Sequence, residues 1–248
     1  MWIVVVDQKN VVEIFNLNLF SMKTITYILL PVLLVFFGFT SSPKLYPDIE
    51  KSIQTYIKDF DQIPQDRKDQ LKKIALFVKT KIAAEKKADL VFVCTHNSRR
   101  SHMAQIWSKA ASEYYGLKGI NTFSGGTEAS AFNANAIKAL LKNGFIITPT
   151  STITNPVYDV KYADSEPAIK AFSKKYSDTP NPKSNFVAVM TCSQADKFCP
   201  NIEGASLRVA IPYDDPKTFD GTPEQEAKYD ERCKQIATEM LYVFSLVK

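Results

Sequence analysis

The sequence predicts an α/β protein with a four-stranded parallel sheet, helices on both faces of the sheet, and an N-terminal helical extension. Two observations predict this fold. After Ala88, short apolar runs that suit strands buried on both faces alternate with helical stretches. Before Ala88, the chain shows helical periodicity and many charges. With 248 residues, of which 45% are hydrophobic, the chain is long enough to bury a substantial core.

The first 42 residues have the pattern of a secretory signal peptide or a membrane anchor. Met22 and Lys23 precede the apolar run Ile25 to Phe39, and small residues follow. The run is shorter than the roughly 20 apolar residues that span a bilayer comfortably. Met22 is a candidate for the true start of the chain. We expect an exported, periplasmic or membrane-anchored protein, with membrane contact through residues 25–39, if this segment is used, and a cytoplasmic one otherwise.

Residues 43–88 are expected to form a helical extension. Pro64 separates the two helical stretches "YPDIEKSIQTYIKDF" and "PQDRKDQLKKIALFVKTKIAAEKKA". In the second stretch Leu71, Ile74, Ala75 and Val78 fall on one helical face. We therefore expect a helical hairpin that packs on the core of residues 89–248, rather than a separate partner-binding module.

Residues 89–248 are expected to form the catalytic domain. The strand candidates are "LVFVC" (90–94), "INTFSG" (120–125), "NFVAVMTC" (185–192) and "SLRVAIPY" (206–213). The helix candidates are Ser101–Tyr115, Asn133–Asn143 and Pro223 to about Ser245. Residues 151–184 are rich in Pro, Tyr, Asp, Ser and Lys, which favours an irregular insertion with a short hairpin and a short helix.

Reactive side chains follow the predicted strands. In parallel sheets, ligands bind at the carboxyl ends of the strands. Those ends carry two thiols, a glycine pair and a carboxylate pair: Cys94, Gly125 and Gly126, Cys192, Asp214 and Asp215. The sequence therefore predicts a functional site at this edge.

The turn after Cys94 has the composition of an oxyanion site. A strand, a tight turn and a helix beginning near Ser101 direct unpaired backbone N–H groups and the positive helix end into the turn, where they favour a thiolate. The planar fork of Arg100 suits two oxygens of an oxyanion, and Asn97 tolerates a left-handed backbone. We expect Cys94 to be a nucleophile held against a bound oxyanion. The predicted oxyanion-binding residues are Thr95, His96, Asn97, Ser98, Arg99, Arg100 and Ser101.

These motifs carry a family resemblance. "VCTHNSRRS" resembles the phosphate-binding loop of the low-molecular-weight protein tyrosine phosphatases and the related arsenate reductases, with its C-x5-R-S pattern and an Asn three residues after the Cys. "FSGGTEA" (123–129) is similar to their S-x-G-T segment, and "PYDDP" (212–216) to their Asp-Pro loop. The resemblance implies the low-molecular-weight phosphatase fold and a role for Asp215 as general acid or base.

The sequence also departs from the family pattern. His96 stands where many members have Gly, and Arg99 where the phosphatases usually have a second cysteine. Arg99 is either a solvated charge or a residue that raises the affinity for a divalent oxyanion. We expect His96 and His102 to be loop and helix-surface residues rather than bases or metal ligands. No spacing typical of metal ligands appears, so we predict no metal and no cofactor.

The number and spacing of the cysteines bear on which of two activities the protein has, arsenate reduction or phosphomonoester hydrolysis. "TCSQADKFCP" begins at the same edge as Cys94 and resembles the relay segment of the thioredoxin-coupled arsenate reductases. The resemblance implies that Cys94, Cys192 and Cys199 reduce arsenate through a redox-active disulfide relay that ends on a thioredoxin-like reductant. The alternative is a static Cys192–Cys199 disulfide in a low-molecular-weight protein tyrosine phosphatase that hydrolyses phosphomonoesters such as phosphotyrosine through a phosphocysteine. Cys233 falls on a helical pattern, and we expect no redox role for it.

The partners follow from the same features. The charge of +5 is mild, and Lys and Arg are mixed with Asp and Glu, so we expect no nucleic-acid binding. A non-catalytic oxyanion sensor is the third hypothesis, but such a module needs no nucleophile. If the protein is exported, a relay that ends on cytoplasmic thioredoxin fits poorly. Three explanations then remain: the reductant is an exported thioredoxin-like protein, the first 42 residues anchor the domain on the inner side of the membrane, or the enzyme is the phosphatase.

Overall fold

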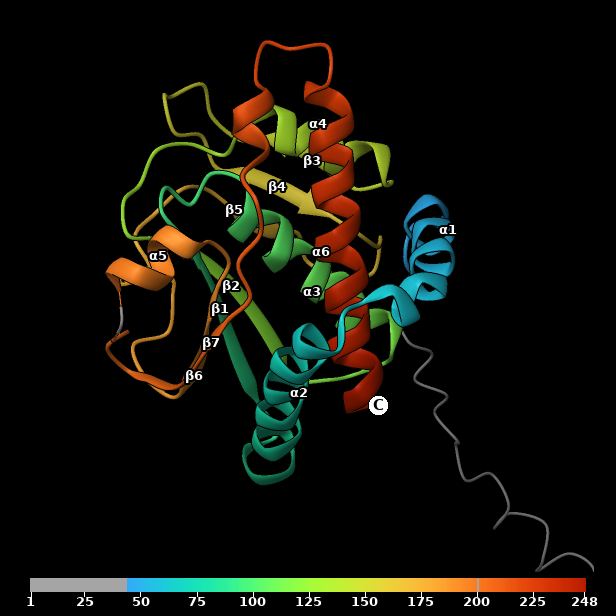
Figure 1. The fold of residues 1–248 in the computed structure, drawn as a ribbon, viewed down its shortest axis with the longest axis vertical. Coiled ribbons are helices and arrows are strands. Elements are labelled where there is room, and N and C mark those ends of the chain that lie inside the picture. Colours follow the sequence, from blue (N-terminus) through green and yellow to red (C-terminus); the bar gives the residue numbers. More distant parts are fainter. Residues whose placement is uncertain (1–43, 200) are drawn as a thin grey trace, which may run out of the picture. The chain divides into compact units, whose positions relative to one another are not determined.

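The computed structural model describes residues 44–199 and 201–248, and these residues belong to one compact unit (Figure 1). The predicted signal peptide or anchor, with its apolar run at residues 25–39, lies outside the described residues. Within the described part of the chain, no helix is both long enough and apolar enough to cross a membrane.

The central element is the predicted four-stranded parallel sheet. Its strand order is β2-β1-β6-β7, so the first strand along the chain is an inner strand. The register pairs Cys94 with Gly126 across β1 and β2, and Val93 with Met190 across β1 and β6. The strands are β1 (Ala88–Cys94), β2 (Ile120–Gly126), β6 (Phe186–Met190) and β7 (Ala205–Ala210).

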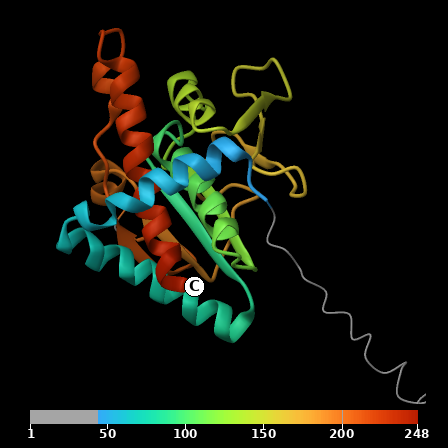
Figure 2. The ribbon, with the colours of Figure 1, turned by 90° about the vertical axis from the view of Figure 1, so that its right-hand side faces the viewer.

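Alternate residues of the strands enter two separate cores. Leu90 and Phe92 of β1 belong to the large core, whereas Val91 and Val93 belong to a smaller one on the opposite face. This is the period-two alternation of a strand that is buried on both sides. The large core is covered by α3 (Arg100–Tyr114) and α6 (Gln225–Val247), which lie side by side, and by α2 (Gln65–Glu85) (Figures 1 and 2). The smaller core is covered by α5 (Ser193–Phe198) and neighbouring loops.

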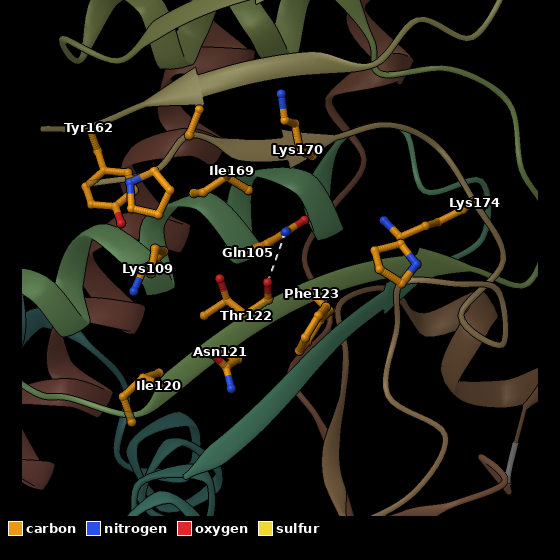
Figure 3. A pocket seen from close by; sticks show the side chains of 13 residues that line it. Gln105, Lys109, Ile120, Asn121, Thr122, Phe123, Tyr162, Ile169, Lys170 and Lys174 are labelled. Carbon is orange, nitrogen blue, oxygen red and sulfur yellow. Dashed lines mark hydrogen bonds between the residues drawn. The ribbon is translucent and has the colours of Figure 1, made fainter. Parts of the chain in front are cut away.

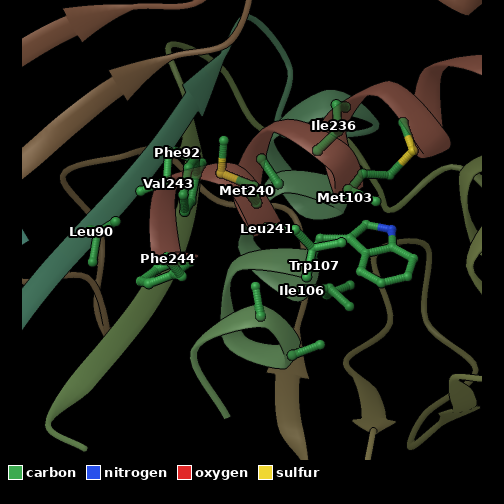
Figure 4. Close-up of a cluster of buried hydrophobic side chains, with 14 of the residues drawn as sticks. Leu90, Phe92, Met103, Ile106, Trp107, Ile236, Met240, Leu241, Val243 and Phe244 are labelled. Carbon is green, nitrogen blue, oxygen red and sulfur yellow. The ribbon is translucent and has the colours of Figure 1, made fainter. Parts of the chain in front are cut away.

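The large core is dense with aromatic and aliphatic side chains (Figure 4). Trp107 of α3 has no exposed surface and contacts Phe145 edge-on, with ring centroids 5.0 Å apart. Met240 and Phe244 of α6 are also fully buried in this core. Burial of side chains of this size stabilises a fold by about 1.5–3 kcal/mol each, so the packing of α3 on α6 is a main support of the domain.

The N-terminal extension is helical and packs on the core, as predicted, but the predicted hairpin is wrong, because its two helices pack on α6 rather than on each other. It consists of α1 (Pro47–Tyr56), the short 3-10 helix η2 (Ile57–Gln62) and α2. Figure 2 shows α1 (blue) and α2 (cyan) lying against α6 (red). The predicted apolar face of α2 is fully or almost fully buried: Leu71, Ile74, Ala75 and Val78.

The insertion is more regular than the sequence indicated. A second, antiparallel sheet has the order β3-β4-β5, with β3 (Ile146–Pro149), β4 (Tyr158–Lys161) and β5 (Ile169–Ala171). The predicted hairpin is present as β4 and β5, but the predicted helix within residues 151–184 is wrong. Strands of three or four residues are too short to show a period-two pattern, and their pairing partners are separated in sequence. The helix α4 (Ala134–Lys142) lies within the predicted range.

Candidate active site

The phosphate-loop candidate, residues 94–101, lies between the end of β1 and the start of α3. Its carbonyl groups are bound from outside the loop. The carbonyl oxygens of Cys94 and Thr95 accept hydrogen bonds from the amides of Thr127 (3.1 Å) and Glu128 (2.8 Å). The carbonyl of His96 accepts from the Ser173 hydroxyl at 2.9 Å. Because these carbonyls are bound from outside the loop, we expect the amide N–H groups of the loop to face inward, in the arrangement that binds an oxyanion.

Asn97 fixes the shape of this loop. Its φ of 44° is left-handed, as the sequence predicted. Its side-chain Nδ2 donates to the Ser101 hydroxyl at 2.9 Å, and its Oδ1 accepts from the amide of Lys174 at 3.0 Å. The Ser101 hydroxyl lies 3.1 Å from the sulfur of Cys94. The buried nucleophile candidate is thus held by a chain of two polar side chains.

Gly126 permits the loop to sit close to β2. A Cβ atom at this position would lie 2.6 Å from the carbonyl oxygen of Thr95, 2.7 Å from the amide of Asn97 and 2.1 Å from the carbonyl oxygen of Glu128. No side chain fits there without displacing backbone, which explains the glycine at the end of β2.

Arg100 joins the loop to the Asp-Pro segment. One terminal nitrogen donates to the carbonyl of Tyr213 at 2.7 Å, and the other pairs with Asp215 Oδ2 at 2.6 Å. Arg100 is 7% exposed, and its Nε has no partner among the described residues. The guanidinium fork that was predicted to bind an oxyanion is therefore engaged by Asp215, whose carboxylate occupies an anion position beside the loop.

The two adjacent aspartates differ in environment. Asp215 caps the 3-10 helix η3 (Pro216–Phe219) by accepting from the amide of Lys217 at 3.1 Å, and only 31% of its side chain is exposed. The side chain of Asp214 is 97% exposed and lies 3.5 Å from Arg232. Of the two, Asp215 is the one placed to act at the loop.

Of the two cysteines predicted to form a relay, Cys192 lies next to the loop. Cys192 follows β6, is 1% exposed and caps α5 by accepting from the amide of Ala195 at 3.3 Å. The Thr95 hydroxyl lies 3.4 Å from its sulfur. Cys94 and Cys192 share the smaller core, and Cys199, at the other end of α5, packs against it. All four cysteines of the chain are free thiols.

Arg99 is not a solvated charge. Its Nε donates to the hydroxyl of Tyr229 at 2.8 Å, its guanidinium lies 3.6 Å from Asp220, and only 13% of the side chain is exposed. Of the two interpretations that the sequence left open, the solvated one is wrong, because α6 and the loop before it cover the side chain.

The two histidines differ. His96 is an exposed loop residue, as expected, and lies 3.5 Å from Glu128. His102 was expected on a helix surface, and this is wrong. It is fully buried, stacked on Phe132 with ring centroids 4.1 Å apart. Burial, together with the nearby Lys174, lowers the pKa of His102 from 6.5 to about 3, so the imidazole is neutral near pH 7.

Cys233 stands apart from the other thiols. It lies on α6, fully buried, and accepts a hydrogen bond from Trp107 Nε1 at 3.2 Å. Burial raises the pKa of Cys233 to about 12, so its thiol stays protonated. Its position on α6 confirms that it is a helix residue.

The loop opens into a cavity of about 550 Å³ whose lining includes Arg100, Cys192, Gln194, Asp215 and Lys217. Gln194 and Lys217 were not predicted as site residues, because nothing in their sequence context distinguishes them from solvated polar residues. In the ranges 44–199 and 201–248, no cluster of three metal-ligating side chains is found.

A second cavity, of about 310 Å³, lies between β2, α3 and the small sheet (Figure 3). Among the residues that line this cavity, Gln105 Nε2 donates to the carbonyl of Thr122 at 3.0 Å. Lys170 and Lys174 also line it. None of the predicted site residues lines it.

Comparison with known proteins places the chain in a family. The family model "Low molecular weight phosphotyrosine protein phosphatase" matches residues 89–166. An arsenate reductase of Bacillus cereus is 33% identical over 155 residues, which are 62% of this chain and 96% of the relative. An arsenate reductase of Brevibacillus brevis is 35% identical over 132 residues, covering 53% of this chain and 79% of the relative.

Solved structures are more distantly similar. A YwlE mutant from Bacillus subtilis aligns with a TM-score of 0.44 and 19% identity, over 64% of this chain and 97% of that chain. An arsenate reductase in the phosphate-binding state aligns with a TM-score of 0.43 and 15% identity, over 65% and 99%.

The protein is an enzyme of the phosphatase-loop class. It belongs to the low-molecular-weight protein tyrosine phosphatase superfamily, whose members include the arsenate reductases that this chain resembles in sequence.

Proposed function

We propose that this protein reduces arsenate to arsenite, with Cys94 as the nucleophile and with Cys192 and Cys199 as a disulfide relay in a catalytic domain of residues 89–248. The observation that carries the proposal is the position of Cys192. Its sulfur lies within 3.4 Å of the Thr95 hydroxyl, in the same buried core as Cys94, and a third thiol lies one short helix away. A phosphatase needs one thiol at this edge, not three.

The first step uses the loop. The inward amides and Arg100 bind arsenate, and the Cys94 thiolate attacks arsenic while a protonated oxygen leaves as water. Asp215 pairs with Arg100. Once the oxyanion takes its position on Arg100, the released Asp215 carboxylate takes a proton from water or from bound hydrogen arsenate and passes it to the leaving oxygen. The product is a Cys94–arsenic adduct in which arsenic is still pentavalent.

The second step moves the electrons. The Cys192 thiolate attacks the sulfur of Cys94, the S–As bond breaks, and its electron pair remains on arsenic, which leaves as trivalent arsenite. Cys94 and Cys192 are now joined by a disulfide. Cys199 then attacks Cys192, which frees the Cys94 thiolate, and an external dithiol protein reduces the resulting Cys192–Cys199 disulfide.

The relay requires α5 to unwind. Along a helix, residues seven positions apart lie about 10 Å apart at about 1.5 Å per residue. A disulfide requires Cα atoms roughly 4.4–6.8 Å apart. The six-residue helix α5 therefore has to open before Cys199 reaches Cys192.

Peptide mapping tests the relay directly. The full-length protein is treated with one equivalent of arsenate and digested under non-reducing conditions. We expect Cys199→Ser to release one equivalent of arsenite and trap a Cys94–Cys192 disulfide, and Cys192→Ser to stop at the arsenic adduct. Cys233→Ser is the matched control and should behave as wild type. A Cys192–Cys199 disulfide that forms without arsenate and resists a thioredoxin-like reductant would refute the reductase.

Phosphomonoester hydrolysis is the second candidate function. The contact between Asp215 and Arg100 supports it, because a general acid beside a Cys-x5-Arg loop is all that phosphocysteine chemistry needs. We expect Asp215→Asn to lower turnover of p-nitrophenyl phosphate by about 10²–10⁴-fold with little change in oxyanion binding. Asp214→Asn is the control, and a larger loss in that variant would reverse the assignment. Comparing arsenate turnover with phenyl phosphate turnover in one preparation decides between the two functions.

A further inference from the structure

We propose that Arg67, on α2 of the N-terminal extension, is a positioning residue for the active site. It holds residues 211–213 in place, and this segment in turn holds Arg100 and presents Asp215. The inference rests on the proposed function only because turnover is one of its readouts. It gives the extension a part in catalysis rather than a role in stability alone.

Arg67 binds the outer side of the segment. One terminal nitrogen donates to the carbonyl of Pro212 at 3.2 Å and the other to the carbonyl of Ile211 at 3.1 Å. Its Nε donates to Glu239 Oε2 at 2.9 Å. Its guanidinium also lies over the ring of Tyr213, 4.6 Å from the centroid. A planar fork that spans two successive carbonyls fixes the direction of the backbone, which a point charge does not do.

The buried partners of Arg67 are themselves fixed. The Tyr213 hydroxyl donates to Glu239 Oε2 at 2.7 Å, and Glu239 is 3% exposed. Burial raises the pKa of Tyr213 well above its usual value, so the phenol keeps the proton that it donates. Arg67, Tyr213 and Glu239 form one desolvated cluster between α2, α6 and the segment. Charge-assisted hydrogen bonds in such a cluster are about twice as strong as neutral ones.

The inner side of the same segment faces the site. The amides of Ile211 and Tyr213 donate to the carbonyls of Met190 (2.9 Å), the last residue of β6, and Thr191 (3.1 Å), which follows it. The carbonyl of Tyr213 accepts from Arg100, and two residues later Asp215 binds the same guanidinium. One short segment is thus held between an arginine of the extension and the arginine of the phosphate loop.

The position of the segment explains why it needs this support. It continues β7, which is an edge strand of the sheet, so no further strand binds its outer carbonyls. When an oxyanion displaces Asp215 from Arg100, the segment loses one of its inner contacts. Arg67 keeps Pro212 and Tyr213 in place through that change, so that Arg100 and Asp215 stay aligned. A misplacement of about 1 Å in such a site can cost about 10²-fold in rate.

Three variants of the full-length protein test the proposal. Arg67→Met removes all donors and keeps most of the apolar stem. Arg67→Lys keeps the charge beside Glu239 but cannot span two carbonyls. Asp59→Asn is the matched control, because the Asp59–Lys234 ion pair (2.8 Å) also joins the extension to α6 but does not contact residues 211–215. The measurements are kcat and KM for p-nitrophenyl phosphate and for arsenate, and urea unfolding.

We expect Arg67→Met and Arg67→Lys to lower kcat by about tenfold and to raise KM about threefold, and Asp59→Asn to leave both constants within twofold of wild type. Urea unfolding should show Arg67→Lys to be nearly as stable as wild type. In an Asp215→Asn background, Arg67→Met should cost less than twofold, because the residue whose position it maintains has lost its acid. The proposal is wrong, and Arg67 only anchors the extension, if Arg67→Lys has the kcat of wild type. The same conclusion follows if the kcat losses of Arg67→Met and Asp215→Asn multiply in the double variant.

A measurement without turnover separates this proposal from the proposed function. Inorganic phosphate should protect Cys94 of the wild type against iodoacetamide, and the half-protecting concentration should rise about threefold or more in Arg67→Met and Arg67→Lys. Because Arg67→Lys retains the ion pair, it provides the test even if Arg67→Met does not fold. If the wild type turns over neither substrate, the proposed function is refuted, but the protection test of Arg67 still applies. If the wild type turns over substrate normally and Arg67→Lys has unchanged protection and kcat, the positioning role of Arg67 is refuted and the proposed function stands.

Discussion

The phosphate loop and α5 lie side by side at one edge of the sheet, yet they are held very differently. The loop is bound from outside by the segments around Thr127, Asn133 and Ser173, and its own side chains connect Asn97 with Cys94 through Ser101. The six-residue helix α5 is bound mainly by one side chain, Arg208, which donates to the carbonyls of Asp196 and Cys199 and pairs with the Asp196 carboxylate.

The difference matches what each region has to do. An oxyanion loop works when its donors are already aligned, because reorganisation would reduce the stabilisation of the transition state. A relay segment has to open in order to bring Cys199 to Cys192, and elements that open are those with few buried contacts and low local stability. The comparison thus predicts that substitutions in the loop disturb binding, chemistry or global stability, whereas substitutions around α5 change its mobility.

The largest effect is expected at the nucleophile. Cys94→Ser should abolish arsenate reduction and phenyl phosphate hydrolysis, because the alcohol is a far weaker nucleophile than a thiolate, while oxyanion binding is retained. Turnover and phosphate binding by calorimetry are the two measurements. Cys233→Ser serves as the control for loss of a buried thiol. More than trace turnover in Cys94→Ser would place the nucleophile elsewhere.

The next effect concerns acid stability. The folded protein lowers the pKa of His102 from 6.5 to about 3, so the unfolded chain binds a proton that the folded one does not. The stabilising contribution is complete above pH 6.5 and is lost as the pH falls towards 3, by about 1.4 kcal/mol per unit and about 5 kcal/mol at most. Urea unfolding from pH 7 to pH 4 should show a shallower loss in His102→Gln than in wild type. The exposed His96→Gln should follow wild type, and equal slopes in all three proteins would contradict the assignment.

A glycine substitution distorts the loop itself. Gly126→Ala places a Cβ atom against the backbone of Thr95 and Asn97, so the loop has to shift. We expect a loss of about 1–3 kcal/mol in unfolding free energy and at least tenfold weaker phosphate binding. In Gly221→Ala no atom lies within 4 Å of the new Cβ, so phosphate binding should be unchanged, although the φ of 79° lowers the unfolding free energy of this variant too. If Gly126→Ala binds phosphate as tightly as wild type, the loop is not rigid.

The smallest effect is expected at α5. Arg208→Met removes the bonds to Asp196 and Cys199, and because the Arg208 side chain is 25% exposed we expect a loss of only about 1 kcal/mol. Amide hydrogen exchange of residues 193–199 should quicken several-fold, and alkylation of Cys199 should quicken with it. Exchange of the loop amides should not change. Quicker exchange in both regions would remove the distinction between them.

Much of the fold and of the phosphate loop could be predicted from local features of the sequence. The apolar runs ending at Cys94 and Cys192 predicted strands of a parallel sheet, and the turn between Cys94 and Ser101 predicted a left-handed backbone at Asn97. These features depend on residues that are consecutive or a few positions apart, where periodicity and turn preferences act.

Tertiary contacts decided the rest. His102 is buried because Phe132 stacks on it. Arg99 is paired because Asp220 and Tyr229, more than 100 residues later in the chain, contact it. Arg67 donates to carbonyls that are 144 and 145 residues away. A polar side chain on a helix has the same local sequence pattern whether it faces solvent or a distant segment. Whether a charge is solvated or directs an active site is therefore determined by the packing of elements that the sequence brings together only in three dimensions.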